Sequence, residues 1–367
     1  MQDAEMKLSA ILKRENNNLD LFRILAAIMV IYGHAYALLP NGGQSDFIGR
    51  MLGYDYSGSL AVKIFFFLSG LVVTNSLISK GNAYEFIISR LFRIWPALIA
   101  TILISVAIIG PILSTKTIAQ YFSDPLTSSY ITNNISLHTS YVLPGVFELN
   151  KYPNTINGSL WTIPYEVYAY VILLSFFMIG ISRSHALAIF TFTIIAAAPI
   201  LKFDFIYSLF PTNHETAMLG PCFAYGSIMA ILKDKININI STAIGSWALF
   251  FILKGSKVEM HALYSAIFIT IIYLASTGAL LKMKPNHDIS YGVYLWGFPV
   301  QQILSMYISE YGILVNQITA IVISCILGYV SWILIEKRCM KIGSLLVKKT
   351  SNIKLKLINR QTTDVEA

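Results

Sequence analysis

Charged residues are scarce in this sequence of 367 residues. Asp, Glu, Lys and Arg together make up 13% of the chain, whereas hydrophobic residues make up 55%. A soluble globular domain carries roughly 25% charged residues, so too few charges are present here to cover a soluble globule. Aromatic residues account for 13%, which suits rings that face lipid or lie at membrane interfaces. The composition therefore predicts an all-α integral membrane protein.

Cysteine is also scarce, and its pattern excludes two kinds of site. Cys222, Cys325 and Cys339 lie far apart, so neither a disulfide framework nor a CxxC site is expected. No cluster of His, Cys and carboxylate residues has the spacing of metal ligands, and we therefore predict no metal. The net charge of +8 reflects basic loops between apolar segments more naturally than a nucleic-acid partner, which we do not expect.

Apolar segments follow one another along almost the whole chain. A membrane span needs roughly 20 apolar residues, and several segments are short enough that neighbouring spans could merge. By this criterion we predict about ten transmembrane helices, near residues 19–39, 58–79, 94–113, 158–180, 185–201, 216–232, 239–254, 260–280, 290–309 and 313–336.

The positions of lysine and arginine predict the orientation of these helices. With the amino terminus inside, basic residues gather in every second loop and after the last apolar segment, as the positive-inside rule requires of cytoplasmic segments. We therefore expect both termini to be cytoplasmic. The chain would comprise a leader (1–18), a membrane domain (19–336) and a basic cytoplasmic tail (337–367) that lies on anionic lipid.

One long loop, residues 114–157, separates the third and fourth predicted helices. The same topology places this loop on the outer face, where it could cover an acceptor site. Membrane lipids are the expected surroundings of the chain, and the sequence indicates no oligomeric state.

Two ionisable residues, Arg23 and His34, lie inside the first predicted helix. Such groups cost about 2.5–3.5 kcal/mol on insertion scales, so they usually face a cavity or a partner. Eleven residues separate them, about 16 Å or nearly three helical turns, so they share one face. Arg23 could instead reach the inner headgroups, and His34 could make an interhelical hydrogen bond. Because neutral imidazole accepts a proton near neutral pH, His34 is the candidate general base.

Glu166 lies near the start of the fourth predicted helix, at about the depth expected for His34. A carboxylate there could orient the imidazole and stabilise its protonated form, as in hydrolytic triads. The alternative is a structural glutamate that is hydrogen-bonded to a tyrosine or tryptophan. We predict Glu166 as a catalytic residue beside His34.

Two arginines, Arg90 and Arg93, stand at the inner end of the third predicted helix. Their i, i+3 spacing places both guanidinium groups on one helical face. Positive-inside anchoring would explain them, but paired arginines also bind phosphates through bidentate hydrogen bonds. We predict that they bind the phosphates of a cytoplasmic donor.

Five groups of residues, in order along the chain, resemble the membrane acyltransferase-3 family. They are Leu19-Asp20 through Arg23 to His34, Phe66-Phe67-Leu68-Ser69-Gly70, Arg90 to Pro96, Ser159-Leu160-Trp161 with Glu166 and Tyr170, and Ser290-Tyr291 with Tyr294-Leu295-Trp296. Each group alone would be a weak signal, but the ordered combination is specific. The resemblance covers about residues 19–336.

The resemblance implies transfer of an acyl group, usually acetyl from cytoplasmic acetyl-CoA, to a hydroxyl of an envelope carbohydrate such as O-antigen. It also implies a location in the bacterial cytoplasmic (inner) membrane. Arg23 and His34 match residues regarded as essential in the family. Arg90 and Arg93 match a pair linked to the donor, and Ser290 and Tyr291 are assigned to the same donor site.

Three positions depart from the family pattern or have no clear role. Gly297 stands where relatives often have histidine, so no catalytic role is transferred to it. Glu336 ends the last helix as in relatives, but Lys337-Arg338 follows where proline is frequent. Lys63 is a candidate contact for an acidic sugar, although a lysine near a helix end more often extends to the headgroups.

These observations favour a membrane O-acyltransferase. Arg90 and Arg93 would hold the CoA phosphates, Arg23 would guide the donor or close the lower cavity, and His34 would deprotonate a sugar hydroxyl. The alkoxide would attack the thioester directly or through a transient acyl-histidine. A transporter or flippase is the competing class, because buried Arg, His and Glu also line substrate pathways without bond making. It would show no dependence on acetyl-CoA.

Overall fold

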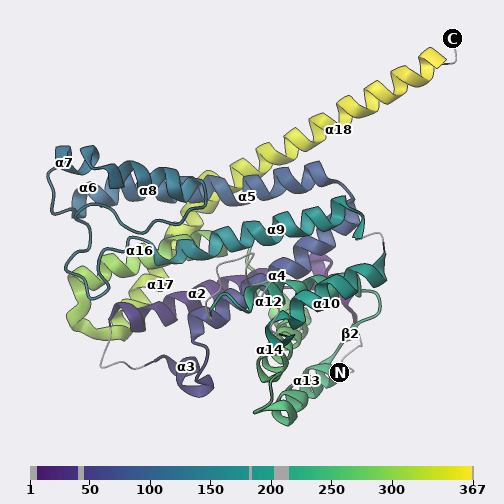
Figure 1. The fold of residues 1–367 in the computed structure, drawn as a ribbon, viewed down its shortest axis with the longest axis horizontal. Helices are drawn as coiled ribbons and strands as arrows, with labels where there is room; N and C mark the ends of the chain where they lie inside the picture. Colours follow the sequence, from purple (N-terminus) through teal and green to yellow (C-terminus); the bar gives the residue numbers. More distant parts are fainter. Residues whose placement is uncertain (1–5, 40–44, 182–183, 202–214, 366–367) are drawn as a thin grey trace.

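The computed structural model describes residues 6–39, 45–181, 184–201 and 215–365. In this part the chain is almost entirely helical, and its only sheet joins two short antiparallel strands, β1 (Met6–Lys7) and β2 (Asn237–Ile238). Most helices lie side by side, and α18 extends beyond them to the carboxyl terminus (Figure 1). The predicted all-α architecture is therefore confirmed.

The helices have the following bounds. The first part contains α1 (Leu8–Ile11), η1 (Arg14–Asn16), α2 (Leu19–Leu38), α3 (Phe47–Leu52), α4 (Ser57–Lys80), α5 (Ala83–Ile104), η2 (Ser105–Ile109), α6 (Gly110–Leu113), α7 (Ile118–Ser123), α8 (Pro125–Ile135), η3 (Gly158–Trp161) and α9 (Thr162–Met178). The second part contains α10 (His185–Leu201), α12 (Leu219–Ile231), α13 (Ile240–Leu253), α14 (Glu259–Ser276), α15 (Gly278–Leu281), α16 (Ser290–Ile308), η5 (Ser309–Tyr311), α17 (Gly312–Ser331), η6 (Trp332–Glu336) and α18 (Lys337–Val365).

Within the described residues, six helical stretches are long and apolar enough to cross a membrane. They are Leu19–Leu38, Ser57–Lys80, Ala83–Leu113, Gly158–Met178, Glu259–Ser276 and Ser290–Ser351, the last of which contains both α16 and α17. Three shorter apolar helices, α10, α12 and α13, coincide with further predicted spans. The chain is a multi-pass membrane protein in which each predicted segment overlaps a helix.

Glycines bring the central helices into backbone contact. A Cβ atom at Gly70 of α4 would lie 2.1 Å from the carbonyl oxygen of Phe223 on α12, and one at Gly226 would lie 2.2 Å from that of Phe67. Small residues at such contacts let membrane helices pack closely. Gly297 has the same role between α16 and α2, because a Cβ there would lie 2.7 Å from Cγ1 of Ile31.

Lys63 does not extend to the membrane surface, and it is not available to a sugar. It is almost fully buried on α4, where its Nζ lies 2.9 Å from a carboxylate oxygen of Asp55 and donates to Ser59 at 2.6 Å. Tyr264 of α14 donates to the other Asp55 oxygen at 2.8 Å. Both predictions for Lys63 are wrong, because Asp55, eight residues earlier in the chain, neutralises the charge.

The long loop of residues 114–157 returns along α5. The hydroxyl of Tyr121 in α7 donates to the carbonyl oxygen of Val106 at 3.1 Å, and the indole of Trp95 donates to that of Ile135 at the end of α8 at 3.2 Å. Val106 and Trp95 are eleven residues apart, about 16 Å of helix. The loop therefore runs beside α5 over this length.

The tail begins as a continuation of the membrane helices. α17 passes through η6 into α18 without a break, and α18 packs on α5 (Figure 1). At their contact a Cβ atom added to Gly343 would lie 3.0 Å from the ring of Phe92. The first part of α18 is thus packed on protein, whereas we predicted that the tail lies on lipid.

Candidate functional site

Two cavities lie at opposite ends of the antiparallel helices α2 and α4. The arginine cavity, with a volume of about 800 Å³, takes Arg23 from the start of α2 and Lys80 from the end of α4. The His34 cavity, of about 910 Å³, takes His34 from the other end of α2 and Tyr56 from the residue before α4. The arginine cavity contains six of the seven predicted site residues, namely Arg23, Arg90, Arg93, Glu166, Ser290 and Tyr291, and His34 lines the other.

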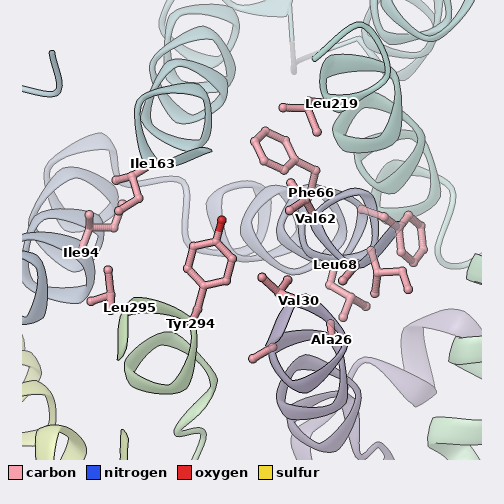
Figure 2. Close-up of a cluster of buried hydrophobic side chains, with 14 of the residues drawn as sticks. Ala26, Val30, Val62, Phe66, Leu68, Ile94, Ile163, Leu219, Tyr294 and Leu295 are labelled. Atoms are coloured by element: carbon pink, nitrogen blue, oxygen red, sulfur yellow. The ribbon is translucent and has the colours of Figure 1, made fainter. Parts of the chain in front are cut away.

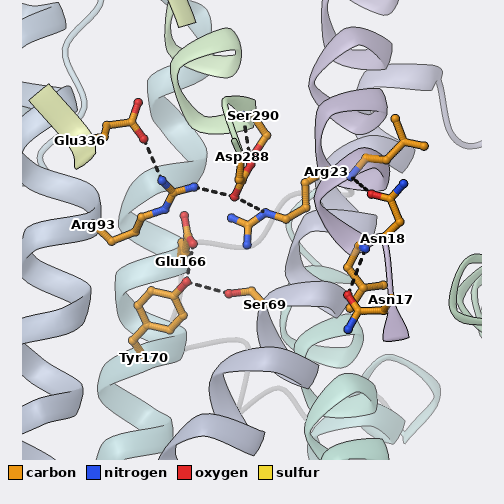
Figure 3. A network of polar contacts seen from close by, with 12 residues as sticks. Asn17, Asn18, Arg23, Ser69, Arg93, Glu166, Tyr170, Asp288, Ser290 and Glu336 are labelled. Carbon is orange, nitrogen blue, oxygen red and sulfur yellow. Dashed lines mark hydrogen bonds and ion pairs between the residues drawn. The ribbon is translucent and has the colours of Figure 1, made fainter. Parts of the chain in front are cut away.

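Arg93 is held by two carboxylates from distant parts of the chain. Its two terminal nitrogens lie 2.8 Å from Asp288 Oδ2 and 2.8 Å from Glu336 Oε2 (Figure 3). Ser331 donates to the second oxygen of Glu336 at 3.1 Å. The guanidinium also lies 5.8 Å from the ring centre of Trp332, within cation–π range. Arg93 therefore joins α5 to the starts of α16 and α18, and both of its terminal nitrogens already have carboxylate partners.

Arg23 shares Asp288 with Arg93 but is less completely paired. Asn18 caps α2 by accepting from the backbone N–H of Leu21 at 3.2 Å, which starts the helix one turn before Arg23. The Nε of Arg23 lies 3.4 Å from Asp288 Oδ2 (Figure 3). Neither terminal nitrogen has a hydrogen-bond partner among the residues that the structure describes. Arg23 thus retains donors for a ligand in the arginine cavity.

Asp288 organises this network, and the sequence analysis did not identify it. The backbone N–H and the hydroxyl of Ser290 both donate to its Oδ1, at 3.1 and 2.5 Å. Burial raises the pKa of Asp288, but the guanidinium groups of Arg23 and Arg93 and the bonds from Ser290 outweigh burial and lower it to about 2. The carboxylate is ionised at neutral pH. Its position two residues before the predicted start of a helix at Ser290 was the available signal in the sequence.

Ser290 and Tyr291 line the arginine cavity, and their hydroxyl groups already donate hydrogen bonds within the protein. Ser290 donates to Asp288, and the hydroxyl of Tyr291 donates to the carbonyl oxygen of Ile94 at 3.1 Å. The ring of Tyr291 lies 5.8 Å from the guanidinium of Arg93. These contacts position Arg93 and Asp288. They leave neither hydroxyl hydrogen free to bond to an acyl donor such as acetyl-CoA.

Arg90 differs from Arg93 although both lie on α5. Among the described residues it has no carboxylate partner, and its guanidinium lies 5.7 Å from the ring centre of Tyr170. Arg14 and Lys348 line the same cavity and are exposed. In total six basic and three acidic side chains line the arginine cavity. An excess of positive charge suits an anionic ligand such as a phosphate.

Glu166 belongs to the arginine cavity and does not contact His34. Its Oε1 accepts from the hydroxyl of Tyr170 at 2.5 Å, and Ser69 of α4 lies 2.7 Å from the same hydroxyl (Figure 3). Because that hydroxyl has one hydrogen, Ser69 is the donor of the second bond. The predicted pairing of Glu166 with His34 is wrong, and the alternative of a glutamate bonded to tyrosine is what the structure contains.

His34 lies half-buried on α2 with an aromatic neighbour. Its ring packs edge-on against Phe298 of α16, with 5.2 Å between ring centres. Its Nδ1 is buried and has no hydrogen-bond partner in the described part of the chain. A buried nitrogen without a partner is uncommon in folded proteins and marks candidate functional groups.

The remaining wall of the His34 cavity is aromatic and rich in hydroxyl groups. It contains six tyrosines, one tryptophan and one phenylalanine, namely Tyr36, Tyr56, Tyr141, Tyr152, Tyr165, Tyr168, Trp161 and Phe298. Five of its residues come from the loop of residues 114–157, namely Leu137, Thr139, Tyr141, Tyr152 and Thr155. Among the described residues its acidic side chains are Asp46 and Glu215, and neither lysine nor arginine lines it. Such a wall offers flat apolar faces together with hydrogen-bonding groups.

A thin layer of side chains separates the two cavities. The hydroxyl of Tyr294 on α16 bonds with Thr162 at 2.6 Å and reaches the carbonyl oxygen of Ser159 at 3.1 Å. Val30 and Val62 face Tyr294 from α2 and α4 (Figure 2). Thr162 lines the arginine cavity and its neighbour Trp161 lines the His34 cavity, so the two cavities approach each other at the start of α9.

Helices of membrane-spanning length, a buried basic cavity and a cavity with a half-buried histidine define a multi-pass membrane protein with groups suited to transfer chemistry. The chain belongs to the membrane acyltransferase-3 family, whose acyltransferase domain matches residues 16–337. The "O-acetyl transferase" of Shigella phage Sf6 is 28% identical over 88% of this chain and 96% of the relative. "Nodulation protein 10" of Rhizobium leguminosarum bv. viciae is 25% identical over 92% and 96%. No solved structure matches the chain.

Proposed function

We propose that the chain transfers an acetyl group from cytoplasmic acetyl-CoA to a hydroxyl of an envelope carbohydrate, such as O-antigen or another surface polysaccharide. The observation that carries the proposal is that one helix, α2, contributes Arg23 to a basic cavity and His34 to a separate aromatic cavity. The name of the phage relative supports an O-linked acetyl group. An anionic donor and a neutral, hydroxyl-rich acceptor would each have a matching cavity.

The two cavities would face opposite sides of the bacterial cytoplasmic membrane. Ten spans with both termini cytoplasmic would place the start of α2 and the end of α4 inside. Arg14, Lys80 and Lys348 gather at the arginine cavity, and the positive-inside rule favours the cytoplasm for that end. The His34 cavity would then open outward, where surface carbohydrates are found.

Arg90, rather than Arg93, would be the main phosphate ligand. Arg93 is neutralised by Asp288 and Glu336, whereas Arg90 has no carboxylate partner in the described residues. Guanidinium groups bind phosphate through parallel N–H bonds. Lys348 of α18 lines the same cavity, so the start of the tail would also contact the donor. Arg93 would position Asp288, and through it Arg23.

Arg23 would guide the arm of the donor that carries the thioester. Its unpaired terminal nitrogens can donate to carbonyl oxygens of that arm, while Asp288 holds its Nε side. It lies about 16 Å along α2 from His34, so it cannot contact the reacting carbonyl while His34 does. To reach His34 the acetyl end must pass the layer at Thr162 and Tyr294, and the Tyr294 side chain would move to admit it.

His34 would act as the general base. Its imidazole takes the proton from the acceptor hydroxyl as the hydroxyl oxygen bonds to the thioester carbonyl carbon. The carbon–sulfur bond then breaks, and the leaving CoA sulfur takes the proton from the imidazolium. The acetyl ester remains on the carbohydrate and free CoA returns to the cytoplasm. The aromatic wall of the cavity would hold the sugar ring and exclude water.

The proposal is tested with membrane vesicles that contain the chain and with matched vesicles that lack it. Radiolabelled acetyl-CoA is added, and label in the glycan fraction is measured, with the acetylated position found by mass spectrometry. Labelled glycan only in the presence of the chain is expected. Glycan that crosses the membrane without acetyl-CoA, and without label, would instead identify a transporter or flippase.

A further inference from the structure

A third cavity lies between α9, α10 and α12 and has a volume of about 560 Å³. Hydrocarbon side chains dominate its wall, including Ile172, Leu173, Phe192 and Phe223, and it has no charged side chain among the described residues. We call it the lateral cavity. It occurs between apolar helices, so its natural ligand is apolar.

The lateral cavity follows one face of α9 for about 16 Å. The residues that α9 contributes are Tyr165, Tyr168, Ala169, Ile172, Leu173 and Phe176. Their spacing of i, i+3, i+4, i+7, i+8 and i+11 is that of a single helical stripe. Many of these side chains are only half-buried, so the stripe is not closed by other helices. An elongated groove of this kind suits a hydrocarbon chain and not a compact ligand.

The lateral cavity adjoins both other cavities, because it shares three lining residues with the His34 cavity and two phenylalanines with the arginine cavity. Tyr165, Tyr168 and Thr216 line both the lateral cavity and the His34 cavity. Leu173 and Phe176 lie farther along α9, away from the His34 end. The polar end of the groove is therefore at the sugar cavity, and its apolar end points toward the middle of the membrane.

We infer that the lateral cavity binds the hydrocarbon chain of a lipid-linked glycan whose sugar occupies the His34 cavity. This inference rests on the proposed function and specifies its acceptor as membrane-anchored. A lipid in the outer leaflet has its head at the surface and its tail toward the membrane centre, which matches the direction of the groove. Because the lateral cavity and the His34 cavity share lining residues, one molecule could place its sugar in the His34 cavity and its tail in the lateral cavity. This arrangement favours the tail of the acceptor over the tail of an unrelated bilayer lipid.

A glycine offers a way to fill the lateral cavity with little disturbance. A Cβ atom at Gly220 of α12 would meet only Ile195, at 3.8 Å, in ordinary van der Waals contact. Gly220→Phe therefore places a ring against the wall of the groove. Gly245 of α13 is the matched control, since it is also an exposed helical glycine and a Cβ there meets nothing within 4 Å. Both variants are expected to fold.

The experiment compares two forms of one acceptor in vesicles that contain the full chain. One is the glycolipid pool extracted from the cells into organic solvent, and the other is the same glycan after release from its lipid. We expect Gly220→Phe to raise the apparent KM for the glycolipid about tenfold and to leave that for the released glycan unchanged. Gly245→Phe changes neither value, and Gly220→Leu gives a smaller rise.

Three outcomes would overturn a proposal and are distinguishable. Equal effects of Gly220→Phe on both acceptors, or no effect on either, would exclude the lateral cavity as a tail site. Photoreactive phosphatidylcholine that labels the groove and is not displaced by the glycolipid pool would make it a bilayer-lipid site. Failure of wild-type protein to acetylate either acceptor would remove the proposed function itself.

Discussion

The arginine cavity and the His34 cavity differ in charge and not in aromatic content. In the part of the chain that the structure describes, eight aromatic side chains line each of them, but six lysines and arginines line the first and none lines the second. In the first cavity most of the charged groups have partners, whereas Nδ1 of His34 has none in the described residues. This difference indicates that one end of the molecule is built to hold an anion and the other to hold a neutral molecule next to a base.

The largest effect is expected from removal of that base. His34→Ala should lower the rate of acetyl transfer by about 10²–10⁴-fold, the usual contribution of a general base. Acetyl-CoA binding should stay within twofold of wild type, because His34 lies outside the arginine cavity. His185→Ala, at an exposed histidine that starts α10, is the control. Retained transfer in His34→Ala would assign the chemistry to another group.

Arg93→Ala should mainly reduce stability. It leaves Asp288 and Glu336 buried without their shared cation, and breaking such a pair costs about 3–5 kcal/mol. The free energy of unfolding of the purified protein in detergent measures this cost, with exposed Arg338→Ala as the control. If Arg93→Ala has the unfolding free energy of wild type and only its affinity for acetyl-CoA falls, then Arg93 is a phosphate ligand and its ion pairs contribute little to stability.

Arg90→Ala should weaken acetyl-CoA binding and leave stability nearly unchanged, in contrast to Arg93→Ala. Loss of hydrogen bonds to a charged phosphate costs about 1.5–3 kcal/mol, a roughly tenfold to hundredfold weaker Kd for acetyl-CoA. The stability of the protein should change little, because Arg90 has no carboxylate partner among the described residues. Isothermal titration with acetyl-CoA provides the measurement. Undiminished affinity would leave Arg90 as a topology determinant alone.

A smaller effect is expected at the layer between the cavities. Tyr294→Phe removes the hydrogen bonds to Thr162 and to the Ser159 carbonyl. Water from the His34 cavity should then reach the thioester more often, and CoA release without acceptor should rise about two- to tenfold, as expected from about 0.5–1.5 kcal/mol. Exposed Tyr307→Phe on the same helix is the control. An unchanged release rate would remove Tyr294 from the barrier.

Local patterns in the sequence identified the helices and seven of the residues that line the two cavities. Apolar length and the shared face of Arg23 and His34 depend on neighbours along one helix, so they could be predicted. The sequence could not decide whether Glu166 faces His34 or a tyrosine, because the answer depends on the rotation of α9 about its axis. The i, i+4 spacing of Glu166 and Tyr170 is compatible with the contact that the structure contains.

Contacts between distant residues account for the main errors. Arg93 pairs with Asp288 and Glu336, which lie 195 and 243 residues away in sequence. Even the nearer Asp55, eight residues from Lys63, was not recognised as its partner. A single sequence does not say which carboxylate will meet a buried cation. The packing of α18 on α5 was missed for a similar reason, because its basic composition alone resembles a segment that lies on lipid.

The central claim is that acetyl is passed between cavities on opposite sides of the membrane. Sealed inverted vesicles with the cytoplasmic face outward test it directly, with labelled acetyl-CoA outside and the glycan enclosed. Label should appear on the enclosed glycan without permeabilisation, and His34→Ala should abolish it. Labelling that requires permeabilisation, so that donor and acceptor share one side, would contradict the claim.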